Sequence, residues 1–134
     1  GPAMEMCARS VILSAGLVSL MADDNYNCAL AHAVCYGLQH FEHVEREYLH
    51  GDLVAYGALV QLAVDGQLDK ARELRAFLVS LGTPVTLAQM RVPLEKTALH
   101  DALIEATTGP DMAHIPYPVT QDMVFDAMRR VETL

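Results

Sequence analysis

Apolar residues recur along most of the chain every three or four positions, a spacing that predicts helices. The pattern is clearest at 68–81, where leucines and an alanine share one side and charged residues the other. Leu53–Val60 is apolar on all sides, which predicts a central, enclosed helix. The same reasoning predicts helices at 6–21, 27–47 and 93–106, a short helix after Thr86 and a final helix after Thr120.

Turn-forming residues separate these predicted helices. Asp52 is expected to cap a helix that runs to Val64, and Thr120 to cap the last helix. Asp65-Gly66 and Gly82-Thr83-Pro84 are typical of helix ends. Because no segment has a clear strand pattern, the sequence predicts an all-α helical bundle.

Composition and charge narrow the classes of partner. The chain has 134 residues, of which 52% are hydrophobic and 19% charged, as expected for one compact domain. Its formal net charge is −8 and its Lys and Arg residues form no cluster, so we expect neither a nucleic acid nor a membrane as partner. The uncharged run Ser10–Ala22 is too short to span a bilayer. Three cysteines make no disulfide framework, which predicts a reducing, cytoplasmic setting.

The first three residues, Gly1-Pro2-Ala3, are typical of a protease-tag remnant. We therefore expect a single helical domain over 4–134. Met4 is either a native start, which would make this a protein in its own right, or a cloning-site residue, which would make it an excised part of a larger one.

Side chains that can bind a metal or line a pocket gather on one side of the predicted helix at 27–47. At 100° per residue, four of them fall within about 40° of His32: Cys28, Tyr36, Gln39 and His43. His50 lies at the next interruption, where the chain can fold back towards this side. Two imidazoles suit Zn²⁺ or Fe²⁺, and a catalytic site also needs a third protein ligand. On spacing alone, two ordinary core or surface histidines are the favoured interpretation.

Four segments, in the same order and spacing, resemble motifs of one enzyme family. Ala29–Leu38 is similar to its alanine-rich "AHA-x-x-x-GL" helix, and His50–Gly57 to its "HGE-x-VA-[FY]-G" motif. Leu81–Leu87 and Ile115–Thr120 are similar to its "GLPxTL" and "MPxPVT" segments. The chain thus resembles the helical C-terminal domain of glycerol dehydrogenase and related iron-containing alcohol dehydrogenases, whose fold is dehydroquinate-synthase-like.

This resemblance implies functions for particular residues. In that family the histidines of the first two motifs bind a metal, so His32 and His50 are the predicted ligands of zinc or iron. The resemblance also implies a small alcohol or hydroxy acid as substrate and NAD as cosubstrate. No Gly-rich phosphate loop occurs in this sequence, so the chain alone is not expected to bind NAD.

Several positions depart from the family pattern near the expected site. The family's third ligand is an Asp further upstream, which this sequence does not contain. Asp23 and Asp24 are most simply helix-terminus residues, and the alternative is that one of them replaces that missing carboxylate. Cys28 and Cys35 are expected to be packing residues rather than nucleophiles. Asp52 stands where the family motif has Glu.

Three hypotheses follow. The first is a metal- and substrate-binding domain of an NAD-dependent alcohol dehydrogenase that is not redox-competent alone. The second is a stand-alone protein that uses the same pocket for lyase, isomerase or hydratase chemistry or for ligand binding. The third is an interaction module, because the first three predicted helices are apolar enough to require a partner, which predicts a homo-oligomer or a partner chain.

Overall fold

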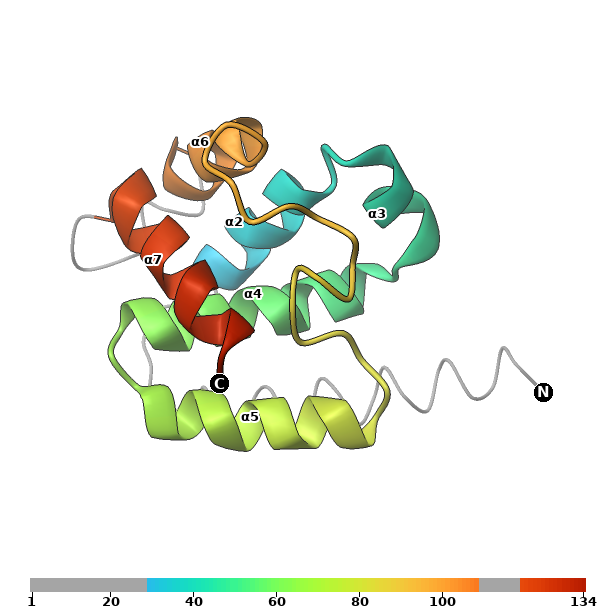
Figure 1. Cartoon of the computed structure of the whole chain (residues 1–134), viewed down its shortest axis with the longest axis vertical. Helices are drawn as coiled ribbons and strands as arrows, with labels where there is room; N and C mark the ends of the chain where they lie inside the picture. Colours follow the sequence, from blue (N-terminus) through green and yellow to red (C-terminus); the bar gives the residue numbers. More distant parts are fainter. Residues whose placement is uncertain (1–28, 109–118) are drawn as a thin grey trace.

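The computed structural model describes residues 29–108 and 119–134. This described part contains helices and no strand, so the predicted all-α bundle is confirmed (Figure 1). The helices are α2 (Ala29–Leu38), α3 (Glu42–Glu47), α4 (His50–Val64), α5 (Leu68–Ser80), α6 (His100–Thr108) and α7 (Gln121–Glu132).

The helix α4 forms the centre of the described bundle. Every residue from Asp52 to Ala63 is buried, and α2, α5 and α7 all pack against this helix. Figure 1 shows α4 crossing the molecule between α5 on one side and α2 and α7 on the other. A helix enclosed on all sides is expected to be mostly apolar, because a buried polar group without a partner loses its hydration at a cost. The prediction of a central position is therefore confirmed.

Two glycines let α2 approach its neighbours closely. A Cβ atom added at Gly57 of α4 would overlap the backbone of Ala31, lying 2.8 Å from its Cα atom. A Cβ atom added at Gly37 of α2 would lie 2.7 Å from the carbonyl oxygen of Ala102 in α6. Because both obstacles are backbone atoms that cannot rotate away, glycine at these positions sets how deeply α2 sits between α4 and α6.

The predicted continuous helix at 27–47 is wrong. Within its described part, α2 ends at Leu38 and α3 begins at Glu42. Phe41 has an extended backbone, with φ −83° and ψ 112°, so it interrupts the helical path. No glycine or proline marks this break, but it allows Val44 to be fully buried. Packing of α3 decides this geometry, and local sequence preference carries no signal of it.

The amphipathic helix predicted at 68–81 is confirmed as α5. Ala71, Leu74 and Leu78 are buried on its inner side. The helix ends where Gly82 adopts φ +74° and the backbone N–H of Thr83 donates to the carbonyl of Leu78 at 3.0 Å. This is the reversal that a glycine just past a helix allows.

Residues 81–99 contain no helix, which corrects two predictions. The short helix expected after Thr86 is instead a series of turns, and the helix expected at 93–106 begins only at His100. Five apolar side chains of this segment are buried: Val85, Leu87, Met90, Val92 and Leu99. This non-helical path of turns lets them reach the core at irregular spacing, which a helix would not allow.

The final helix has the predicted beginning. The backbone N–H of Met123 donates to the Thr120 side-chain oxygen at 3.2 Å, so Thr120 caps α7 as expected. Near the other end of α7, the Glu132 carboxylate accepts hydrogen bonds from the backbone N–H groups of Leu87 and Ala88. The end of α7 thereby holds the turn that replaces the expected short helix.

Candidate functional site

His32 is the fourth residue of α2 and is half-buried. It lies between two buried alanines, Ala31 and Ala33, within the helix that packs against α4 and α6. His32 is not without an interaction partner. His32 therefore sits where a helix of the core meets the edge of the bundle.

His50 is the first residue of α4, and its side chain lies outside the described part of the structure. The helix begins three residues earlier than expected, because Asp52 was predicted to cap a helix whose first residue is Leu53. Asp52 is instead its third residue, where its carboxylate accepts a hydrogen bond from the Leu49 backbone N–H at 3.4 Å. This is one half of a capping box, and it holds the turn that carries His50.

The predicted ligands belong to the two helices of one crossing. Gly57 contacts Ala31, the residue before His32. Position 50 precedes Gly57 by two helical turns, about 10 Å of rise, and therefore lies on the same side of α4. Two imidazoles suit Zn²⁺ or Fe²⁺, so this donor set fits such a metal in kind. No group of three His, Cys, Asp or Glu side chains that could hold a metal occurs among the described residues, which do not include the His50 side chain.

The other pocket candidates separate from one another. Tyr36 is on α2 with 42% of its surface exposed, and Gln39 is in the turn that follows. His43 is on α3, beyond the break, so the helical-wheel argument that aligned it with His32 fails. The Nε2 atom of His43 lies 3.0 Å from the Met90 carbonyl oxygen. That Gln39, Tyr36 and His43 line a pocket stays a prediction.

The segment around α3 holds the turn at 89–91 through side chains. Tyr48 donates a hydrogen bond to the Gln89 carbonyl at 3.1 Å, next to the contact between His43 and Met90. Arg91 forms an ion pair with Glu47, and this hydrogen bond keeps the pKa of the Glu47 carboxyl below its usual value. Arg91 has φ +56°, an unusual conformation for a residue with a side chain. His43, Tyr48 and Glu47 therefore all contact this turn from the segment around α3.

Three candidate residues, Asp23, Asp24 and Cys28, lie outside the described residues. The remaining cysteine of the "AHA" helix, Cys35, is fully buried, and burial raises the pKa of its thiol to about 12. A thiol that keeps its proton at neutral pH is a poor nucleophile, so Cys35 is a packing residue, as predicted.

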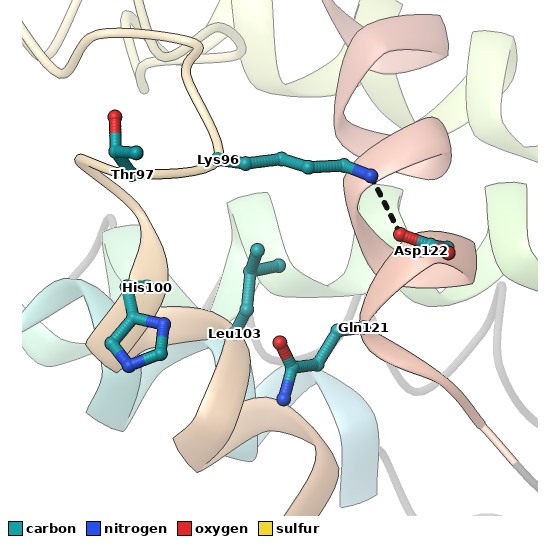
Figure 2. Close-up of a pocket in the computed structure, with 6 residues that line it drawn as sticks. All are labelled: Lys96, Thr97, His100, Leu103, Gln121 and Asp122. Carbon is teal, nitrogen blue, oxygen red and sulfur yellow. Dashed lines mark hydrogen bonds and ion pairs between the residues drawn. The ribbon is translucent and has the colours of Figure 1, made fainter.

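Sequence reasoning did not single out a cavity of about 400 Å³ between α6 and α7. Figure 2 shows Leu103 between His100 and Gln121, with Lys96 reaching towards α7, where its Nζ atom pairs with Asp122 Oδ1 at 2.7 Å. The Lys96 and Asp122 side chains are 59% and 77% exposed. The Lys96 cation is already paired and solvated, so this surface hollow offers no isolated charge for catalysis.

Sequence reasoning also missed Gln61, a buried amide in the apolar helix α4. Its Oε1 atom accepts a hydrogen bond from the Ala31 backbone N–H at 3.1 Å. The signal was present, because Gln61 interrupts an apolar run of valine, leucine and alanine. A polar side chain in a helix expected to be enclosed needs a partner, and here that partner adjoins His32.

Comparison with known proteins gives a consistent relationship. No protein-family model matches the chain. The chain is 34% identical to hydroxycarboxylate dehydrogenase A of Escherichia coli over 126 residues, which cover 92% of this chain and 34% of that protein. It is 32% identical to glycerol dehydrogenase of Pseudomonas putida over 103 residues, or 75% of this chain and 28% of that protein. It is 30% identical to glycerol dehydrogenase of Thermotoga maritima over an aligned length of 136 residues, gaps included, which covers 98% of this chain and 35% of that protein.

The chain is therefore similar in sequence to glycerol and hydroxycarboxylate dehydrogenases, and it spans about a third of the length of the curated relatives it matches. None of the described helices has the length and apolar character needed to cross a membrane.

Proposed function

We propose that this chain is the helical, metal- and substrate-binding part of an NAD-dependent alcohol dehydrogenase that oxidises a polyol or a hydroxy acid. The observation that carries the proposal is the similarity to hydroxycarboxylate dehydrogenase A, which extends over 92% of the chain. The relatives' names supply the substrate class. A chain that spans a third of such enzymes would depend on a nucleotide-binding part for hydride transfer and would not be redox-competent alone.

In this proposal His32 and His50 would hold Zn²⁺ or Fe²⁺. The metal, when bound, supplies Lewis acidity that lowers the pKa of a substrate hydroxyl. The chain's own contribution is rigidity. The contact of Gly57 with Ala31 fixes α2 on α4, and the hydrogen bond from Leu49 to Asp52 fixes the turn that carries His50. Preorganised ligands of this kind give a metal a defined geometry.

The remaining parts of the proposal concern the substrate, the cellular compartment and the partners of the chain. The substrate would be a small alcohol or hydroxy acid, and the protein would act in the cytoplasm. A homo-oligomer or a partner chain would cover the apolar surface that the sequence predicts in its first helices.

Metal content of purified variants tests the proposal. We expect about one equivalent of Zn²⁺ per wild-type chain after equilibrium dialysis, and loss of that metal in His32→Ala and in His50→Ala. His100→Ala is the matched control, because His100 is exposed at the start of α6 and should keep full metal content. Equal metal in all four proteins, measured by elemental analysis, would remove the metal-binding part of the proposal.

Activity provides a second test. The purified chain alone should not reduce NAD⁺ in the presence of glycerol or a hydroxy acid. NADH formation at a steady rate by the wild-type chain, absent in His32→Ala, would contradict the dependence on a separate nucleotide-binding part.

A further inference from the structure

Gln61 makes an unusual hydrogen bond between two helices. Its side chain is 1% exposed, and its Oε1 atom accepts from the Ala31 backbone N–H at 3.1 Å. Ala31 is the third residue of α2. This backbone N–H of α2 therefore has its acceptor on α4, and the bond joins the two helices.

The other half of the same amide has no such partner. The Nε2 atom of Gln61 is buried and donates to no acceptor among the described residues. A buried donor without an acceptor is costly and rare, so among the described residues the contact that accounts for a buried amide here is the hydrogen bond to Ala31. An apolar side chain of similar size at this position would avoid the burial of that amide but would remove the hydrogen bond to the Ala31 N–H.

Gln61 acts on the same residue as Gly57. Positions 57 and 61 are one helical turn apart on one side of α4, and both contact Ala31. The glycine sets the distance between the helices, and the hydrogen bond, which is directional, sets the rotation and slide of α2. Ala31 is thus held at two points, and His32 is the next residue.

We propose that Gln61 is a positioning residue for His32, which it holds by anchoring α2 to α4 at Ala31. The inference rests on the proposed function, because only that proposal makes His32 a metal ligand. In this proposal, the precise position given to a metal ligand offsets the free-energy cost of burying the Gln61 Nε2 group, which has no acceptor among the described residues. Partners of this kind, one step removed from a metal, commonly change its affinity about tenfold or more when removed.

The test uses the full chain with Gln61→Met, which keeps the volume and removes both hydrogen-bonding groups. Gln61→Glu keeps an oxygen that can accept from Ala31. Gln89→Met is the matched control, because the Gln89 Oε1 atom also accepts a backbone hydrogen bond, from Val85 at 2.7 Å, in a different part of the fold.

Two measurements are compared: Zn²⁺ affinity by competition with a chelator, and amide hydrogen exchange of the metal-free chain. We expect Gln61→Met to weaken Zn²⁺ binding about tenfold and to speed exchange at Ala31 and His32. Gln89→Met should leave both unchanged. Gln61→Glu should restore slow exchange, and if it does not fold, the two methionine variants still decide.

The outcomes separate the two proposals. Unchanged exchange at Ala31 and His32 in Gln61→Met would overturn the anchoring of α2. Faster exchange with unchanged Zn²⁺ affinity would overturn the positioning role and leave a structural one. If the wild-type chain binds no Zn²⁺, the metal-based function fails and the positioning of a ligand fails with it, whereas the exchange data still decide whether Gln61 anchors the helix.

Discussion

The consecutive helices α4 and α5 show two opposite ways in which a helix takes part in one core. Every residue of α4 from Asp52 to Ala63 is buried, whereas α5 buries Ala71, Leu74 and Leu78 and leaves much of its surface in water. Other helices surround α4, while α5 packs mainly against α4. The number of packed sides, more than helix length, decides which residue types each helix can carry.

This difference changes what a polar residue means in each helix. On α5, Asp69 and Arg72 are solvated, and their pairing is a surface event. On α4, the Tyr56 hydroxyl and the Gln61 amide are buried at a cost that must be offset by a partner or by a function. Buried polar groups of the enclosed helix are therefore the informative ones.

The largest effect that would test this contrast is expected from Gly57→Ala on α4. Alanine favours a helix over glycine by about 1 kcal/mol. The added methyl group would nevertheless collide with the Ala31 backbone, and we expect a net loss of about 3 kcal/mol in the free energy of unfolding. Denaturant unfolding followed by circular dichroism measures it.

Gly66→Ala is the control for that substitution. Gly66 follows α4, has φ +76° and has no atom within 4 Å of an added Cβ, so only backbone strain of about 1 kcal/mol is expected. Equal losses in the two variants would show that the crossing of α2 and α4 tolerates a methyl group.

A smaller effect of the opposite sign is expected from Tyr56→Phe. The Tyr56 hydroxyl is fully buried and donates to no acceptor among the described residues, so its removal should stabilise the fold by about 1 kcal/mol. Tyr48→Phe provides the contrast. This variant loses the hydrogen bond from Tyr48 to the Gln89 carbonyl, so it should be slightly less stable than the wild type. A destabilised Tyr56→Phe would indicate a partner for this hydroxyl.

The same tyrosine predicts a pH dependence. Burial, with a smaller contribution from Glu132, raises the pKa of Tyr56 well above its ordinary value. Above the pKa of an unfolded tyrosine, the unfolded state releases the proton that the folded state keeps. The free energy of unfolding is therefore unaffected by Tyr56 below about pH 10 and falls as the pH rises further. Unfolding measured at increasing alkaline pH should show a smaller loss of stability in Tyr56→Phe than in the wild type.

The smallest effect is expected on the exposed side of α5. Arg72 Nη1 and Asp69 Oδ1 are 3.2 Å apart, but both side chains are largely in water. Exposed pairs of this kind contribute little to stability, so Asp69→Asn should leave the thermal midpoint unchanged. A clear drop in that midpoint would mean that exposed residues of α5 contribute to stability in addition to its buried residues.

The regular helices could be predicted because their signals are local. The stripe of α5, the apolar surround of α4 and the Thr120 cap of α7 all follow from residues a few positions apart. Two features could not be predicted: the break between Leu38 and Glu42, and the non-helical path at 81–99. They depend on where Val44, Val85 and Leu87 find space in a core built by other helices.

The candidate site divides in the same way. Only the resemblance to family motifs pairs His32 with His50 as metal ligands, and that pairing stays a prediction, whereas the apolar periodicity was enough to place His32 on a helix. The separation of His43 from His32, the close contact at Gly57 and the partner of Gln61 required the folded arrangement. These features join residues up to 30 positions apart, whose distance is set by packing and not by local backbone preference.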